Sequence, residues 1–322
     1  MSTPTLTARV YAMRYEADGI VSVEFRPATE QLVFPPFEPG SHIDLYLPNG
    51  LVRNYSLCNS HTDEQRYVVA VLHDRNSRGG SCYVHEQLRV GATIEISAPR
   101  NHFALIEQAP KSVLLAGGIG ITPLWCMLQK LAAQGQVTEL FYCARNRREA
   151  AFVSEIQDLC ESRDIPCHFH FDQEQGSAPQ LQTLLAGRGP DAHYYCCGPA
   201  PMLAAFEAAC HALGYENVHI ERFAAVPVSQ DVVDDAFELR LAKSDKTIHV
   251  PAGKSILDAL LDAGISIEHS CKDGVCGSCE TRILEGEADH RDGVLSEKER
   301  AAGRSLMVCV SRCKRGPLVL DI

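Results

Sequence analysis

SCKDGVCGSCE, residues 270–280, places cysteines at positions 271, 276 and 279, and a further cysteine follows at 309. This C-x4-C-x2-C spacing with a distant fourth cysteine is the plant-type pattern for a [2Fe–2S] cluster. Gly274 and Gly277 would let the loop bend around a cluster while backbone N–H groups point at the sulfurs. Because iron and sulfide bind best to soft, anionic sulfur, we predict four metal ligands: Cys271, Cys276, Cys279 and Cys309.

A zinc site with four cysteine ligands is the alternative for this stretch. Structural zinc is usually held by two separate C-x2-4-C knuckles, whereas here three cysteines share one loop and the fourth stands alone. This arrangement favours iron–sulfur over zinc. The other ten cysteines occur singly, apart from the Cys196–Cys197 pair, and we predict that they are small buried or neutral residues.

Composition narrows the class of protein. A chain of 322 residues suggests two or three domains, and a net charge of −11 argues against nucleic acid or anionic membranes as partners. There is no apolar run long enough to span a membrane, and the N-terminus MSTPTLTARV has no apolar signal core. Fourteen cysteines without a secretion signal therefore indicate a reducing cytoplasm.

The first hundred residues have the pattern of an antiparallel barrel or sandwich. Near-alternating or apolar segments at 6–15, 19–28, 41–50, 66–74 and 92–100 are separated by Gly, Pro and Asn turns, and one helical segment follows at 81–91. Within this region Arg53-Asn54-Tyr55-Ser56-Leu57 offers a cation for a phosphate and a ring that can stack on a planar group. The alternative is an ordinary barrel strand with a surface Arg and a half-buried Tyr.

Gly79-Gly80-Ser81 opens the helical segment and is a second candidate contact. Glycines before a helix N-terminus expose N–H groups to an anion, although the same tripeptide is also an ordinary helix cap. Together with Arg53 it indicates a phosphate-bearing aromatic cofactor, which describes a flavin.

From residue 112 the sequence pattern changes to alternating strands and helices. Strands are predicted at 112–116, 138–145, 167–171, 192–198 and 217–223, with helices at 124–135, 148–163, 179–187 and 201–214. This is the pattern of a doubly wound α/β sheet, which binds ligands at the carboxyl ends of its strands. Two glycine turns fall there and indicate a nicotinamide dinucleotide site formed by Gly117, Gly118, Gly120, Thr122, Pro123, Cys197, Gly198 and Pro199.

Asp172 ends the strand at 167–171 and bears on the choice of nucleotide. A carboxylate there would hydrogen-bond a free ribose 2′-OH and repel a 2′-phosphate, so we favour NADH over NADPH. The alternative is that Asp172 begins a solvated loop. Beyond it, the acidic, Pro-containing segment 225–237 is a predicted linker. It leads to a small α+β domain with strands at 237–243, 246–250, 280–287 and 318–322 and a helix at 255–264.

With these parts in this order, the chain resembles the phthalate dioxygenase reductase family over essentially its whole length. The resemblance implies three domains: an antiparallel β-barrel flavin domain (1–107), an α/β NAD domain (108–226) and a plant-type β-grasp ferredoxin domain (227–322). It places Arg53 and Gly80-Ser81 on the flavin phosphate and Tyr55 against the isoalloxazine. Phe223 is the terminal aromatic that can shield the flavin. FMN is favoured over FAD because no extra segment for an adenylate half is evident.

The implied activity is a conversion from two-electron to one-electron transfer. NADH supplies two electrons as hydride, a [2Fe–2S] cluster accepts one, and a flavin can do both. The resemblance places Ser56, Cys197 and Phe223 at the reacting atoms. None of the thirteen histidines pairs with carboxylates at a recognisable catalytic or zinc-ligand spacing, so oxygen chemistry is expected on a partner. The implied partner is a transiently docked Rieske-type oxygenase. Two alternatives are another acceptor, such as a di-iron monooxygenase or a cytochrome, and a non-catalytic carrier or sensor.

Overall fold

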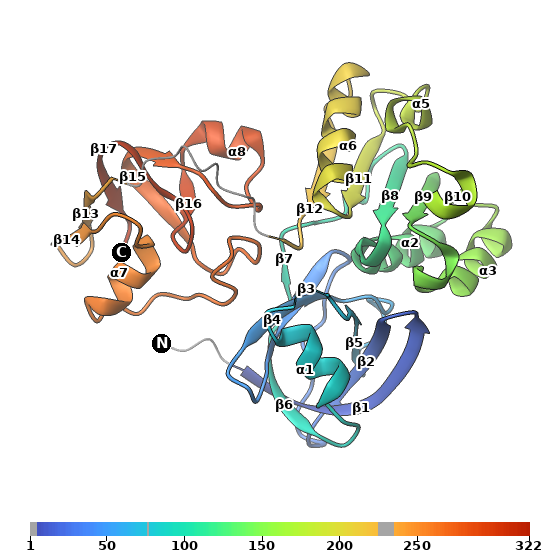
Figure 1. Ribbon diagram of the computed structural model, residues 1–322, viewed down its shortest axis with the longest axis horizontal. Helices are drawn as coiled ribbons and strands as arrows, with labels where there is room; N and C mark the ends of the chain where they lie inside the picture. Colours follow the sequence, from blue (N-terminus) through green and yellow to red (C-terminus); the bar gives the residue numbers. More distant parts are fainter. Residues whose placement is uncertain (1–4, 76, 225–234) are drawn as a thin grey trace. The chain divides into compact units, whose positions relative to one another are not determined.

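The computed structural model describes residues 5–75, 77–224 and 235–322 (Figure 1). The chain divides into two compact units, the first ending at Glu221 and the second beginning at Arg222. The domain boundary expected at 226/227 lies outside the described residues. In the described part of the chain, no helix has the length and apolar character needed to cross a bilayer.

The first half of the first unit is a curled antiparallel sheet, the barrel (5–101). Its strands follow the order β4-β3-β6-β1-β2-β5, with β7 paired to β3, and a bridge between Leu57 and Val69 links the two ends of this order. The expected barrel is therefore confirmed. Its elements are β1 (Thr5–Ala17), β2 (Ile20–Pro27), β3 (Ser41–Tyr46), β4 (Val52–Ser56), β5 (Tyr67–Leu72), α1 (Gly80–Glu86), β6 (Thr93–Ser97) and β7 (Arg100–Asn101).

The second half of the first unit is a five-stranded, fully parallel sheet, the parallel-sheet lobe (112–221), in the order β10-β9-β8-β11-β12. Its strands are β8 (Ser112–Gly117), β9 (Thr138–Ala144), β10 (Cys167–Phe171), β11 (His193–Cys197) and β12 (Val218–Glu221). Its helices are the 3-10 turns η1 (Gly118–Gly120) and η2 (Arg147–Glu149), then α2 (Ile121–Gln134), α3 (Val153–Arg163), α4 (Asp172–Gln175), α5 (Leu181–Leu185) and α6 (Ala200–Ala212).

Helices cover both faces of this sheet, as the alternation predicted. One apolar cluster joins the sheet to α2 and α3, and a second joins its opposite face to α5 and α6. The helix expected at 148–163 begins only at Val153. Phe152 adopts φ 60°, which a helix interior does not allow, and the preceding residues form η2 instead.

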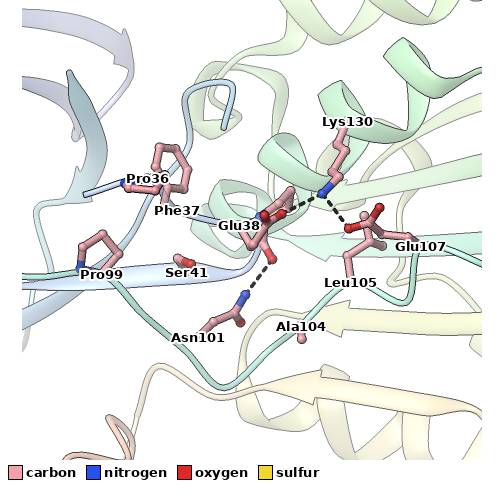
Figure 2. Close-up of a pocket in the computed structure, with 11 residues that line it drawn as sticks. Pro36, Phe37, Glu38, Ser41, Pro99, Asn101, Ala104, Leu105, Glu107 and Lys130 are labelled. Carbon is pink, nitrogen blue, oxygen red and sulfur yellow. Dashed lines mark hydrogen bonds and ion pairs between the residues drawn. The ribbon is translucent and has the colours of Figure 1, made fainter. Parts of the chain in front are cut away.

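Lys130 on α2 connects the barrel to the parallel-sheet lobe. Its side chain is only 7% exposed, and its amine lies 2.6 Å from Glu38 Oε2 and 2.8 Å from Glu107 Oε1 (Figure 2). A cleft of about 450 Å³ opens beside this junction, between Phe37, Asn101 and Leu105. None of the predicted site residues lines it.

The second unit is a small mixed sheet, ordered β14-β13-β17-β15-β16, in which β13 runs parallel to β17. The predicted hairpin and helix are present, but α8 was not predicted. Ser296 and Glu299 form a capping box at its start, a signal that S-x-x-E carries in the sequence. The elements are β13 (Phe237–Leu241), β14 (Lys246–Val250), α7 (Ile256–Asp262), β15 (Glu280–Asp289), α8 (Glu297–Ala302), β16 (Ser305–Met307) and β17 (Arg312–Leu320).

Candidate functional site

Arg53 on β4 and the glycines at the start of α1 lie together. A Cβ atom on Gly80 would fall 2.6 Å from both Cγ and Nε of Arg53, so only glycine lets the guanidinium side chain cross the start of the helix. Gly79 adopts φ 95°, which favours glycine. Arg53 donates to the carbonyl oxygens of Val52 and Arg78 at 2.8 and 3.3 Å. Arg53 and the glycines at the start of α1, which the sequence analysis combined into one phosphate site, therefore lie on one surface.

The other residues of this surface have distinct surroundings. Ser81 Oγ donates to Ser77 Oγ at 2.9 Å, which ties the start of α1 to the loop before it. Asn54 donates its side-chain amide to Asp44, a fully buried carboxylate on β3, so this side chain braces the barrel wall. Tyr55 is half-buried, and burial raises the pKa of its phenol to about 12, which keeps the ring neutral.

Ser56 at the end of β4 meets a residue that sequence reasoning missed. Its Oγ donates to Glu221 Oε2 at 3.3 Å, although the two are 165 positions apart. Glu221 ends β12 and is the register partner of Cys197 on β11. Burial raises the pKa of Glu221 to about 8, while the hydrogen bond from Ser56 lowers it. A carboxyl that titrates near neutrality therefore lies where the barrel meets the strand ends of the parallel sheet.

The two predicted glycine turns pack directly against each other at those strand ends. A Cβ on Gly117 would lie 2.7 Å from Pro199 Cδ and 3.1 Å from the Cα of Gly198. A Cβ on Gly120 would lie 2.2 Å from the carbonyl oxygen of Cys197, so both positions require glycine. Because the two turns carry glycines where they meet, their main chains lie side by side without intervening side chains at one edge of the sheet. A dinucleotide site needs this arrangement.

The remaining residues of these turns occupy different environments. Gly118 adopts φ 54° and has open space where a Cβ would be. Thr122 is buried in the first turn of α2 and donates to the carbonyl of Ile119 at 3.1 Å, and Pro123 beside it is also buried. Cys197 is fully buried, and burial raises the pKa of its thiol well above the ordinary value. That thiol is therefore neutral.

Asp172 begins α4 at the carboxyl end of β10, and its side chain is 42% exposed. The structure adds a neighbour that the sequence did not reveal. The guanidinium of Arg147, the first residue of the 3-10 turn η2 that follows the adjacent strand β9, lies 4.6 Å from the centre of the Phe171 ring and 3.8 Å from Glu174 Oε1. Of the two acidic residues in this segment, Asp172 and Glu174, the second is therefore paired with the cation of Arg147.

Phe223 lies just beyond β12, at the start of the second unit, and is 43% exposed. Its predicted position against a flavin ring is a relation between the two units and stays a prediction.

The four predicted cluster ligands come together in the second unit. The thiols of Cys271 and Cys276 contact each other, as do those of Cys279 and Cys309. The contact with Cys271 lowers the pKa of Cys276 to about 5. The Asp273 N–H donates to Cys271 Sγ at 3.3 Å, so backbone donors point at sulfur as expected. Four converging sulfurs in a donor-rich loop fit a [2Fe–2S] cluster.

Backbone shape explains how one short loop supplies three of these sulfurs. Lys272, Gly274 and Gly277 all adopt positive φ, between 57° and 72°, so the loop reverses direction repeatedly. Lys272 is the one non-glycine among them, and its amine lies 3.0 Å from Asp258 on α7. The predicted roles of Gly274 and Gly277 as bending points agree with this conformation.

Asp292 supports the cluster loop and was not singled out from the sequence. Its carboxylate is fully buried and accepts the N–H groups of Val294 and Leu295 at 3.1 and 2.8 Å. The next residue, Gly293, donates to the carbonyl of Gly274 at 2.8 Å. This buried turn therefore braces the loop that presents the cysteines.

Comparison with known proteins agrees with this architecture. Residues 114–208 match the oxidoreductase NAD-binding domain and residues 239–314 the 2Fe-2S iron–sulfur cluster binding domain. The chain is 46% identical over 318 residues to phenoxybenzoate dioxygenase subunit beta of Ectopseudomonas oleovorans, covering 98% of this chain and 97% of that protein. Phthalate dioxygenase reductase has a similar structure, with TM-score 0.70 and 36% identity over 99% of this chain and 98% of its own.

The chain belongs to the phthalate dioxygenase reductase family. It is therefore an oxidoreductase with a ferredoxin-reductase-like barrel, an NAD-binding domain and a C-terminal 2Fe-2S domain. A self-sufficient type IV cytochrome P450 monooxygenase also contains a region of this shape, with TM-score 0.90 and 35% identity. That match covers all of this chain but only 42% of the larger protein.

Proposed function

We propose that this reductase transfers electrons from NADH through FMN and a [2Fe–2S] cluster to a separate Rieske-type oxygenase that hydroxylates or demethylates a small, often aromatic, molecule. The observation that carries the proposal is a contact between the predicted flavin-binding segment and the predicted dinucleotide-binding turns. Ser56 of the flavin-binding segment hydrogen-bonds Glu221, and Glu221 pairs in the sheet with Cys197, which belongs to those turns. We assign flavin binding to 1–107, NAD binding to 108–226 and the cluster to 227–322, in a cytoplasmic protein.

Bound FMN would supply the conversion from two-electron transfer, as hydride from NADH, to one-electron transfer toward the cluster. The chain supplies orientation and charge. Arg53, with Gly79, Gly80 and Ser81, would hold the phosphate, and Tyr55 would stack against the ring as a neutral phenol. Asn54 fixes the strand that carries them through its bond to Asp44. By its likeness to the family's terminal aromatic, Phe223 would be the residue that shields the bound ring.

The dinucleotide is held at the shared edge of the two glycine turns. Gly117, Gly120, Gly198 and Pro199 bring the turns together, while Gly118 leaves open space beside its backbone for the nucleotide. Thr122 and Pro123 fix the first turn of α2 behind them. Asp172 would accept a hydrogen bond from the ribose 2′-OH, which favours NADH.

Glu221 and Ser56 manage the proton that accompanies hydride transfer. Ser56 Oγ donates to Glu221 Oε2, and burial lets this carboxyl exist in either protonation state near neutral pH. We assign to Glu221 the storage of a proton and to Ser56 the positioning of the ring edge. Cys197 stays a neutral thiol beside Glu221.

The cluster is held by Cys271, Cys276, Cys279 and Cys309, and the rigid turn around Asp292 keeps the ligand loop in place. A cytochrome is the second candidate acceptor, because a P450 monooxygenase carries a region of the same shape. The oxygen chemistry itself belongs to the partner.

An anaerobic NADH titration watched by visible absorbance and EPR tests the proposal. We expect bleaching of the flavin together with the rhombic signal of a reduced [2Fe–2S] cluster, and release of FMN rather than FAD on denaturation. Flavin bleaching without an iron signal would refute the electron path. Addition of a Rieske oxygenase or a P450, each with its substrate, then separates the two acceptors by product formation.

A further inference from the structure

His73, Cys82 and Glu86 form a cluster of metal-ligating side chains on the barrel, away from the cysteines that bind the iron. One ligand atom from each residue lies within 4.8 Å of the other two. His73 directly follows β5, and the other two residues are four positions apart on α1, where side chains share one face of a helix. The cluster therefore spans two elements of the barrel.

The backbone and the neighbouring rings hold this cluster in position. The N–H of His73 donates to the carbonyl of Gly19 at 2.7 Å, which fixes where the chain leaves β5. The His73 ring stacks on His85, with centroids 4.8 Å apart, and His85 Nε2 lies 2.9 Å from the carbonyl oxygen of Val71. His73 Nε2 already lies 3.8 Å from Glu86 Oε1. Small side-chain rotations alone can therefore bring the three donors onto one ion.

The donor set identifies the class of ion. Imidazole nitrogen, thiolate sulfur and carboxylate oxygen together suit zinc, whereas magnesium and calcium prefer oxygen alone. In a tetrahedral zinc site the ligand atoms are roughly 3.3 to 3.8 Å apart, given bond lengths of about 2.0 to 2.3 Å. His73 and Glu86 have 41% and 60% exposed side chains, so they have room to close the remaining distance of about 1 Å.

We propose that His73, Cys82 and Glu86 bind one zinc ion, with water as the fourth ligand. The Cys82 thiol loses its proton to the solvent as the Zn–S bond forms, so binding weakens as the pH falls. The spacing H-x8-C-x3-E matches no common zinc pattern, and only the packing of α1 on β5 brings the residues together.

Zinc at this position acts on the start of α1. Cys82 directly follows Ser81, and the same helix begins where Gly80 packs on Arg53. An ion that ties α1 to the end of β5 therefore holds the proposed phosphate contact in place and slows flavin release. This consequence rests on the proposed function, whereas metal binding itself does not.

Calorimetric titration of the cluster-loaded, flavin-loaded protein with Zn²⁺ tests the site, with Cys82→Ser and His73→Gln as variants. Cys313→Ser is the matched control, because it removes another partly exposed thiol, located in the second unit. We expect one zinc per chain in the parent and in the control. In the two variants the affinity should fall more than about 100-fold, beyond the 10–100-fold cost of losing an outer-shell partner. Unchanged visible spectra show that the variants are folded.

Equal zinc affinity in the parent and Cys82→Ser would overturn the site. The coupling is tested separately by FMN dissociation rates with and without zinc. Slower release in the parent but not in Cys82→Ser supports it, and equal rates refute the coupling while leaving the metal site intact. Failure of NADH to bleach the flavin would instead count against the proposed function, since zinc affinity does not depend on it.

Discussion

Replacing Glu221 by glutamine should make the stability of the first unit less dependent on pH. Burial raises the pKa of Glu221 to about 8, so the folded protein holds a proton that the unfolded chain releases near its ordinary value. Folded molecules then bind more protons than unfolded ones in this range, and stability falls as the pH rises between these values. Glutamine is neutral throughout and still accepts the hydrogen bond from Ser56 Oγ at 3.3 Å.

The size of the effect follows from the width of that interval. Between the ordinary pKa of a glutamate and the raised pKa of about 8, each pH unit lowers the free energy of unfolding of the parent by about 1.4 kcal/mol. The whole interval therefore sets an upper limit of about 4 to 5 kcal/mol. Because Glu221 is half-buried, solvent reduces this value, and we expect about 2 to 3 kcal/mol. The variant should match the parent near about pH 5 and exceed its stability by that amount near about pH 9.

Urea unfolding followed by tryptophan fluorescence measures the difference. The chain has one tryptophan, Trp125 on α2, so the signal comes from the unit that contains Glu221. Ser56→Ala serves as a companion variant, because it removes the hydrogen bond that lowers the pKa of Glu221 and should extend the pH-dependent range upward. Parallel stability curves for the parent and Glu221→Gln from about pH 5 to about pH 9 would refute the raised pKa and the proton-storage role.

Three further outcomes are expected. Cys309→Ser should abolish the EPR signal of the cluster and leave NADH-driven reduction of ferricyanide intact; persistence of the signal would contradict the ligand assignment. Gly80→Val should weaken FMN binding by about tenfold or more, because its side chain meets Arg53 where a Cβ already lies at 2.6 Å, and fluorescence titration of the apoprotein measures this. Asp292→Ala should destabilise the second unit by about 3 kcal/mol, since a buried carboxylate with two backbone donors is lost, and cluster absorbance during urea unfolding measures it. Burial alone would raise the pKa of Asp292, but the neighbouring His290 imidazole and the N–H of Leu295 hold it below its ordinary value. The ionised Asp292 therefore stabilises the second unit above the ordinary pKa of an aspartate, and this stabilisation is lost as the pH falls through the lower pKa of the folded protein. The parent should consequently lose its cluster in acid more steeply than the variant.

Sequence reasoning succeeded where a local pattern carries the chemistry. The cysteine spacing, the helix-opening glycines beside Arg53 and the strand–glycine–helix units are short-range signals. The structure places each on the expected kind of element. The positive φ of Gly274 and the close contact at Gly80 show why those residues had to be glycine.

What the sequence could not supply are the pairings made by tertiary packing. Glu221 stands on a short edge strand with no motif, and its significance depends on a serine 165 positions away. Lys130 would ordinarily be assigned to the surface of an amphipathic helix, yet its ion pairs with Glu38 of the barrel and with Glu107 offset the cost of burying it. Arg147 enters the surroundings of Asp172 from the turn η2 after the neighbouring strand β9, which a search along the chain after Asp172 does not reach.

The hydrogen bond between Ser56 and Glu221 also sets an order of events during synthesis. Ser56 leaves the ribosome with the barrel, but its acceptor lies on β12, the last strand of the same unit. Contacts between such distant residues form late, because a long loop must close first. A nascent chain can therefore complete the barrel while the proton-handling pair is still missing. The proton role proposed for this pair therefore becomes available only once the final strand of the first unit is in place, and electron transfer to the cluster awaits the cysteines of the second unit.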